Sequence, residues 1–408
     1  MGTRFRFLAG IVVPVLLLSL SACSNSTSTG PFSSGTGALW VATQGDSSVS
    51  AYSIDLTTGI LTANGGEMPT GKVPTAMLVA PSGKVVFILN SNSSVPANSP
   101  PCTLPSPGSI SAYTVNTDGT LSAVSGSSGQ TGSIPLAMTM DAGGHFLFVA
   151  NQGLQCDPAS GTISVFSVQN STLTEVPGSP FPSAAVGAPG GTGPTGLAVT
   201  PDAKFLYVAN QYDGTVTKFS VDGSGVLTQG PVVAVGTAPS TAGITPDGGF
   251  LYVGNASTIS GFAICNQVVT SCSDPTSPDG SLSIIDGSPF PGGIQPVAIV
   301  FAPSGKFLFV VNRQSNQISQ YKIATGTGVL TSNTQSTIST GANPVAGTIR
   351  VGTTTVTATG GIIDYLYVPN FGASSISVYS FDSTLGLLSL VGGPVTTTGG
   401  QPAAVGSE

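Results

Sequence analysis

Charged side chains are scarce in this chain of 408 residues: only 7% are Asp, Glu, Lys or Arg, and histidine occurs once, at His145. The ten basic residues form no cluster, so no basic face could neutralise phosphates, and we expect no nucleic-acid partner. A single histidine cannot build a His-rich metal site, and we expect neither a metal ion nor an organic cofactor. Long segments with a helical apolar period are also missing, so helix should be scarce.

Glycine and proline are abundant instead, with 55 and 31 residues, and 40% of the chain is hydrophobic. A disordered chain with so little charge would need a lower hydrophobic content. The composition therefore favours an all-β protein of many short strands joined by turns that contain Gly and Pro.

The N-terminal segment has the features of an export signal. Arg4 and Arg6 precede an apolar stretch at 8–20 that is too short to span a bilayer as a stable helix. The sequence Leu-Ser-Ala-Cys that follows, ending at Cys23, resembles the lipobox of bacterial lipoproteins, in which cleavage precedes the cysteine. We predict a signal peptide at 1–22 and lipidation of Cys23; the alternative is an ordinary signal peptide with an incidental cysteine.

The predicted lipid gives the protein both a location and a partner. We expect an exported protein of the cell envelope that is attached to a membrane through its N-terminus. Ser24 follows the cysteine in place of the aspartate that resembles an inner-membrane retention signal, which indicates the outer membrane in a Gram-negative cell. The polar segment at 23–37 is expected to be the lipidated cysteine and a flexible tether.

An internal repeat decides the predicted fold. A short apolar strand, ending in asparagine in six of its copies, occurs seven times at intervals of 45 to 61 residues. The copies are LWVAT at 39–43, VFILN at 86–90, LFVAN at 147–151, LYVAN at 206–210, LYVGN at 251–255, LFVVN at 308–312 and LYVPN at 366–370. Their continuous apolar character is typical of strands buried on both faces, as in a propeller blade. An open solenoid or two sandwiches are the alternatives, but sandwich strands would alternate apolar and polar residues.

Each copy predicts a unit of four strands, a to d. A Pro-led strand a and a tight turn precede the apolar strand b, an alternating strand c follows a loop, and a Gly-Xaa-Leu strand d ends the unit. The chain enters at a strand b, at Leu39, and ends on QPAAVGSE at 401–408, which has the pattern of strand a. We therefore expect 38–408 to form an all-β, monomeric, seven-bladed β-propeller of four-stranded antiparallel blades, in which the C-terminal strand joins the N-terminal blade and closes the ring.

The repeat also carries a family resemblance. PDAKFLYVAN at 201–210, followed by TVTKFSVD at 215–222, resembles the YVTN-type repeats of the lactonase family, which includes 6-phosphogluconolactonase-like seven-bladed propellers. The resemblance covers nearly all of 38–408. It implies the propeller fold and suggests lactone hydrolysis, although the repeated residues build blades rather than chemistry.

The loops between strands b and c lie on the face where propellers usually bind ligands. They contain Gln44-Gly45-Asp46, Gln152, Gln211-Tyr212-Asp213, Arg313-Gln314 and Phe371, which supply acid, base, amide and aromatic groups. As ligand-binding residues we select Asp46, Gln152, Tyr212, Asp213, Arg313 and Phe371. The ligand could be a small molecule, a glycan or a protein, and the alternative is that these are ordinary loop residues.

Catalytic residues cannot be assigned from the sequence. Lactone hydrolysis needs an activated water, a general base and a group that holds the oxyanion. Arg350, in PVAGTIRV at 344–351, is the only charge on a predicted strand a, where it could bind an anion or cap the strand end. His145 lies in a predicted a–b turn, where other units have lysine, and is expected to be solvated. We therefore predict a ligand-binding or scaffold module, with a lactone hydrolase as the alternative.

Four further cysteines are expected to form two disulfides. An even number in an exported protein suggests disulfides rather than a metal site, and four cysteines allow three connectivities. Cys102 and Cys156 lie in the b–c loops of neighbouring units, while Cys265 and Cys272 flank a short insertion after a strand c. We predict the pairs Cys102–Cys156 and Cys265–Cys272.

Overall fold

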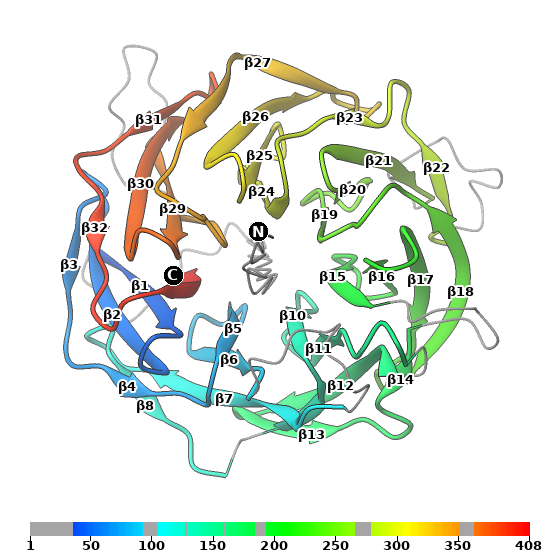
Figure 1. The fold of residues 1–408 in the computed structure, drawn as a ribbon, viewed down its shortest axis with the longest axis horizontal. Coiled ribbons are helices and arrows are strands. Elements are labelled where there is room, and N and C mark those ends of the chain that lie inside the picture. The colour runs from blue at the N-terminus through cyan, green and yellow to red at the C-terminus, as the bar shows by residue number, and fades with distance from the viewer. Residues whose placement is uncertain are drawn as a thin grey trace, which may run out of the picture.

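The computed structural model describes residues 36–92, 104–126, 129–157, 160–183, 193–265, 279–350 and 363–408. These residues form seven antiparallel sheets around one central axis (Figure 1). They contain no α-helix, and hence no helix that could cross a membrane. The seven-bladed β-propeller predicted from the repeat is confirmed.

In each blade the strands follow one another from the axis outwards in the order a, b, c, d. The strands a are β33 (Pro402–Ser407), β5 (Pro74–Val79), β10 (Pro135–Met140), β15 (Pro194–Val199), β19 (Thr241–Ile244), β24 (Pro296–Phe301) and β28 (Thr348–Arg350). The strands b are β1 (Thr36–Thr43), β6 (Val85–Asn90), β11 (Phe146–Asn151), β16 (Phe205–Asn210), β20 (Phe250–Gly254), β25 (Phe307–Asn312) and β29 (Ile363–Asn370). Both lists begin with blade 1.

The outer half of each blade consists of strand c and an interrupted strand d. The strands c are β2 (Ser48–Asp55), β7 (Pro107–Val115), β12 (Thr162–Gln169), β17 (Thr215–Val221), β21 (Thr258–Ile264), β26 (Gln317–Ile323) and β30 (Ser375–Asp382). The strands d are β3 (Leu61–Ala63), β8 (Leu121–Ala123), β13 (Thr172–Glu175), β18 (Leu227–Ala234), β22 (Leu282–Ile284), β27 (Leu330–Ser339) and β31 (Leu388–Leu390).

The pairing of strand d with strand c is interrupted in every blade, in one of two ways. In five blades a second short strand also pairs with c: β4 (Met68–Pro69), β9 (Gly129–Ser133), β14 (Phe181–Pro182), β23 (Phe290–Pro291) and β32 (Val395–Thr396). In blades 4 and 6, β18 and β27 are continuous, but their register against strand c shifts part-way. Such interruptions make the outer edges poor templates for pairing with another chain.

The ring closes as the sequence predicted. Strand β33 pairs with β1, with Trp40 opposite Gly406 and Val41 opposite Val405, and β1 pairs with β2. The last residues of the chain therefore supply the innermost strand of the first blade. Strand β1 begins at Thr36, two residues before the predicted start of the domain.

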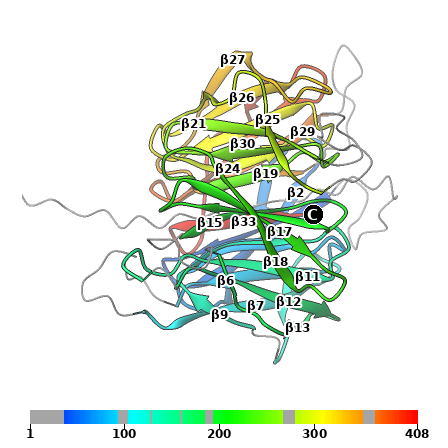
Figure 2. The same cartoon turned by 90° about the vertical axis from the view of Figure 1, so that its right-hand side faces the viewer.

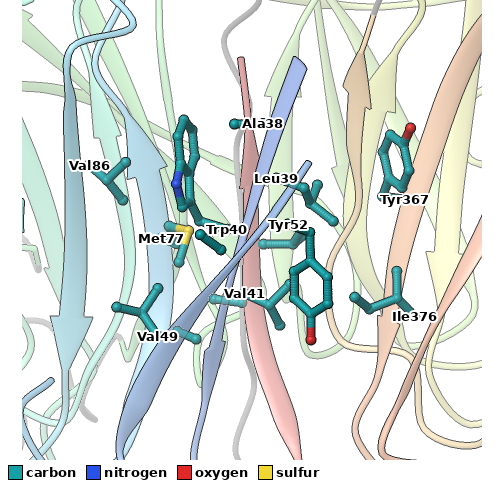
Figure 3. Packing of buried hydrophobic residues seen from close by; sticks show 14 of the residues in the cluster. Ala38, Leu39, Trp40, Val41, Val49, Tyr52, Met77, Val86, Tyr367 and Ile376 are labelled. Atoms are coloured by element: carbon teal, nitrogen blue, oxygen red, sulfur yellow. The ribbon is translucent and has the colours of Figure 1, made fainter. Parts of the chain in front are cut away.

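The two faces of strand b pack against the two neighbouring blades, which explains its continuous apolar character. On β1, Trp40 lies towards Met77 of blade 2, whereas Leu39 lies on the side of Tyr367 in blade 7 (Figure 3). Trp40 and Leu39 are both 0% exposed.

Aromatic side chains on strands b also bond to the next blade. Tyr207 donates to the carbonyl of Gly280 at 2.6 Å, and the indole Nε1 of Trp40 donates to that of Gly119 at 2.9 Å. Each acceptor lies in the c–d turn of the following blade. Gly280 has a φ of +69°, and a Cβ there would lie 2.6 Å from the ring of Phe205, so only glycine fits.

The asparagine that ends six of the strands b holds the start of strand c. Its Nδ2 donates at 2.9 to 3.0 Å to a Ser or Thr hydroxyl on strand c, which belongs to the third residue of that strand in five blades and to the fifth residue of β7 in blade 2. The pairs are Asn90–Ser111, Asn151–Ser164, Asn210–Thr217, Asn255–Ser260, Asn312–Ser319 and Asn370–Ser377. The most conspicuous repeated residue is therefore structural.

The antiparallel order divides the loops between two faces of the disc (Figure 2). The b–c loops and d–a connections lie on one face, which we call the mouth face. The a–b and c–d turns lie on the other, which we call the turn face.

Candidate functional site at the mouth of the ring

One residue in each blade, just after the end of strand b, is tied to the segment that leads into strand a. In six blades the backbone N–H of the residue directly after strand b donates at 2.8 to 2.9 Å to the carbonyl of the residue just before a proline that lies at or ahead of the start of strand a. In blade 5, Ala256, two residues after the end of β20, donates at 2.9 Å to the carbonyl of Thr237, two residues before Pro239. The pairs are Gln44–Gln401, Ser91–Val73, Gln152–Ile134, Gln211–Gly193, Ala256–Thr237, Arg313–Gln295 and Phe371–Asn343. Because the strands a surround the axis, the seven donor residues encircle it on the mouth face. We call them the mouth ring.

The backbone that accepts the hydrogen bonds of the mouth ring is held in an unusual conformation in four blades. The acceptor residues Val73, Ile134, Gln295 and Asn343 have φ values of 53°, 54°, 58° and 49°, in the left-handed region. Such residues cost roughly 1–3 kcal/mol each and persist only where the surroundings fix them. The mouth-ring residues are thus bonded to backbone whose conformation the surrounding structure fixes.

Hydrogen bonds between neighbouring blades connect the first residues of the strands a around the axis. Thr75 Oγ1 donates to the carbonyl of Pro135 at 3.0 Å, and Thr195 Oγ1 to that of Pro239 at 2.9 Å. Gln44, in the mouth ring, donates from Nε2 to the carbonyl of Pro74 at 3.0 Å. The mouth ring therefore stands on a scaffold that is cross-linked between blades.

The predicted ligand-binding residues divide into two groups. Gln152, Arg313 and Phe371 belong to the mouth ring itself. Asp46, Tyr212 and Asp213 lie one or two residues further along their b–c loops. Sequence reasoning also pointed to Gln44 and Gln211 but missed Ser91 and Ala256, which appear only when the seven strand ends are aligned and the next position is compared.

The polar members of the mouth ring provide mainly amides and one cation. Gln152, which is 5% exposed, donates from Nε2 to Oε1 of Gln211 at 2.7 Å and so connects blades 3 and 4. Arg313 is half-buried, and this burial lowers the pKa of its guanidinium. Partly dehydrated guanidinium groups are well suited to bidentate recognition of carboxylate or phosphate oxygens.

Tyr212 and Asp213 extend the site beside blade 4. The Tyr212 hydroxyl is buried without a hydrogen-bond partner among the described residues, and burial raises its pKa. Its ring covers Gly193, where a Cβ would lie 2.4 Å from a ring carbon. Burial also raises the pKa of the Asp213 carboxyl, which makes its ionised form a stronger base.

Asp46 has a structural task that the sequence did not reveal. In blade 1, Thr43 replaces the asparagine that ends strand b elsewhere. Asp46 Oδ1 accepts hydrogen bonds from Thr43 Oγ1 at 2.7 Å and Ser48 Oγ at 2.8 Å, which hold this b–c loop. Burial alone would raise the pKa of Asp46, but its hydrogen bonds, from Thr43 and Ser48 above all, lower it.

Other predicted residues lie away from the mouth ring or outside the described residues. His145 is on the turn face, in the a–b turn of blade 3 as predicted, and Arg350 ends the inner strand β28. Cys23, Cys102 and Cys272 lie outside the described residues, so the lipidation site and both disulfide pairings stay predictions. In the described part of the chain, no three His, Cys, Asp or Glu side chains are grouped so that they could hold a metal ion.

Comparison with known families agrees with this architecture. The profile described as "Lactonase, 7-bladed beta-propeller" matches residues 159–268, 182–346 and 290–404, which together cover more than half of the chain. The chain belongs to this lactonase family. No curated protein matches it.

Solved structures similar to this lactonase-family chain include three from bacteria. Two carry the provisional name 6-phosphogluconolactonase: one from Bacteroides uniformis (18% identity, TM-score 0.66, covering 92% of this chain and 100% of that one) and one from Bacteroides fragilis (19%, 0.67, 92% and 98%). The third is the periplasmic gluconolactonase PpgL of Pseudomonas aeruginosa (18%, 0.65, 91% and 99%). At such identities the likeness shows the shared fold.

Proposed function

We propose that this protein is an extracytoplasmic, lipid-anchored propeller that binds a small polar ligand or glycan at the mouth ring. The observation that carries the proposal is the contrast between the repeated positions and the mouth ring. The asparagine, the strand-b aromatics and the turn glycines recur from blade to blade and have structural partners. The mouth ring is held in every blade by a backbone bond to the segment that leads into strand a, yet its side chains differ.

The groups around the mouth suit a ligand rich in oxygen atoms. Gln44, Gln152 and Gln211 offer amides, Arg313 a partly dehydrated cation and Phe371 an aromatic face. A carbohydrate or sugar acid presents hydroxyl and carboxylate groups to such donors and an apolar ring face to the aromatic residue. These contacts, made from a preorganised backbone, would limit the entropy lost on binding.

Lactone hydrolysis at the same mouth is the second candidate function. Membership of the lactonase family and the names of the similar structures favour it. No mouth-ring residue is a carboxylate or a histidine. Asp213, with its raised pKa, is the residue we propose as the base, and Arg313 or backbone amides would hold the oxyanion.

Binding is tested with the full-length protein and a panel of neutral sugars, sugar acids and phosphorylated sugars, by calorimetry. We expect at least one to bind, and Arg313→Ala and Gln152→Ala to weaken that binding at least tenfold. The matched control is Lys306→Ala, on the turn face of the blade that carries Arg313. No binding by any compound, or equal affinity in all variants, would remove the mouth ring as the site.

Turnover of sugar lactones separates the two candidate functions. A kcat above ~1 s⁻¹, within the ordinary enzyme range, that is abolished by Asp213→Asn would establish the hydrolase. Binding without turnover would establish the ligand-binding module.

Export and anchoring form a separate part of the proposal and rest on the sequence alone. Cys23→Ala should leave an unlipidated precursor, so labelled palmitate that still enters this variant would contradict the anchor. Peptide mapping without reduction should recover Cys102 joined to Cys156 and Cys265 joined to Cys272, and any other pairing would overturn the assignment. We also propose a monomer, which the interrupted outer strands support.

A further inference from the structure

The a–b turn of blade 3 departs from its counterparts in two positions. A lysine precedes strand b in blades 2, 4 and 6, at Lys84, Lys204 and Lys306, whereas blade 3 has His145 there. Asp141 takes the place that Thr200 has in blade 4. Because shared positions build the blades, a pair of ionisable side chains confined to one blade is a candidate for chemistry.

Asp141 fixes the orientation of the His145 ring. The Asp141 side chain is 2% exposed, and its Oδ2 lies 3.0 Å from His145 Nδ1. It also accepts from the backbone N–H of Phe146 at 2.5 Å and of Gly143 at 3.1 Å. A carboxylate only accepts hydrogen bonds, so Nδ1 carries the hydrogen, and in the neutral ring Nε2 is left as a base.

The His145 ring borders a depression between blades 3 and 4 on the turn face. Its side chain is 73% exposed, and the depression has a volume of about 540 Å³. Lys204, Asp202 and Asp222 line the same depression. Lys204 Nζ is 3.5 Å from Asp202 Oδ2, which is long for a hydrogen bond, so the ammonium group has donors to offer a bound molecule.

We propose that Asp141 and His145 form the general-base dyad of a second, hydrolytic site for uncharged open-chain esters. His145 Nε2 takes a proton from water as the water oxygen bonds to the carbonyl carbon. The C–O bond to the leaving oxygen then breaks, and the same proton passes to that oxygen, so that an acid and an alcohol are formed. Asp141 orients the imidazole, and Lys204 stabilises the oxyanion.

The lining of the depression selects for substrates without negative charge. Asp202 and Asp222 stand beside His145 and Lys204, so an anionic ester would meet two carboxylates. The same carboxylates favour release of the acid that is formed. The site lies on the face opposite the mouth ring and is independent of the function proposed there.

The test follows hydrolysis of 4-nitrophenyl acetate, an uncharged open-chain ester, by the full-length protein. We expect saturable turnover. His145→Gln should lower kcat/KM by ~10²-fold, the lower end of the usual general-base contribution. Asp141→Asn and Lys204→Gln should each lower kcat at least tenfold. The matched control is Lys306→Gln, at the equivalent turn position of blade 6, which should leave the rate unchanged.

Two results would overturn the proposal. One is that the wild-type protein hydrolyses the ester no faster than the His145→Gln variant does. The other is a rate that rises linearly with substrate and does not respond to Asp141→Asn, as expected of any exposed imidazole. If Asp141→Asn fails to fold, acylation of the single histidine with diethyl pyrocarbonate provides the second readout: it should abolish turnover in the wild type, and continued turnover would contradict the dyad.

Discussion

Gln152 donates from its side-chain nitrogen to the side-chain oxygen of Gln211 at 2.7 Å, and this bond joins two neighbouring members of the mouth ring. It couples the orientation of one amide to that of the other. Two residues 59 positions apart in the sequence therefore act as one unit at the mouth.

A double-mutant cycle tests that coupling. Gln152→Ala and Gln211→Ala should each destabilise the protein, and the double variant should lose less than the sum, with a coupling energy of about 1 kcal/mol, typical of a net hydrogen bond. Denaturant unfolding measures the three differences. Strict additivity would show that the bond does not contribute in solution.

The asparagine that ends strand b should be required for stability. Asn210→Ala removes the bonds to Thr215 at 3.2 Å and to the buried Thr217 at 2.9 Å, and leaves both hydroxyls without this donor. We expect a loss of about 2 kcal/mol in the free energy of unfolding. Gln155→Ala, at an exposed loop position, is the control and should change it by less than about 0.5 kcal/mol. Equal effects of the two variants would contradict the structural role.

The bond from a strand-b tyrosine to the next blade gives a third prediction. Tyr207→Phe keeps the ring in its 0% exposed position but leaves the carbonyl of Gly280 without its donor. The free energy of unfolding should fall by about 1–3 kcal/mol, the cost of leaving a buried acceptor unsatisfied. Phe309, the equivalent residue of blade 6, provides the control, because Phe309→Leu removes packing but no such bond. An unchanged melting temperature for Tyr207→Phe would show that the bond is dispensable.

Stability should fall in acid because of the c–d turns. Hydrogen bonds from Thr57, Thr120 and Ser224 lower the pKa of the Asp55, Asp118 and Asp222 carboxyls below the usual value of 3.8. A pKa that is lower in the folded state gives stability that is present above the unfolded pKa and is lost as the pH falls through the folded pKa. The melting temperature should therefore drop below about pH 4. The triple Asp→Ala variant should drop less over the same interval, and parallel curves would refute the assignment.

Most of the fold could be predicted because the sequence repeats. Seven copies of an apolar strand, such as LYVAN at 206–210, predicted the number of blades, and the strand-a pattern at the C-terminus predicted the closure with β1. The bond from Tyr207 to Gly280 could not be predicted, because it depends on how neighbouring blades are rotated relative to each other. The interruptions of the strands d were missed for a different reason: short polar edge strands show little periodicity in the sequence.

The candidate site could be predicted only in outline. The b–c loops were identified as its location, but the backbone bond that defines the mouth ring joins residues such as Gln152 and Ile134, whose relation appears only in three dimensions. Asp46 was selected for its charge, whereas the structure shows that it replaces an asparagine contact in blade 1. His145 was interpreted as a solvated turn residue, and the sequence gave no sign that the buried Asp141 holds its ring.

The central claim is that the repeated residues build the propeller while the mouth ring binds the ligand. The most direct test uses two variants, Arg313→Ala and Asn210→Ala. For each variant we measure the melting temperature of the protein and the dissociation constant for the compound of the panel that binds the wild type most tightly. We predict that Arg313→Ala weakens binding at least tenfold and leaves the melting temperature nearly unchanged. Asn210→Ala should lower the melting temperature and, well below it, bind with the affinity of the wild type. The opposite pattern, or loss of both properties in both variants, would contradict the account.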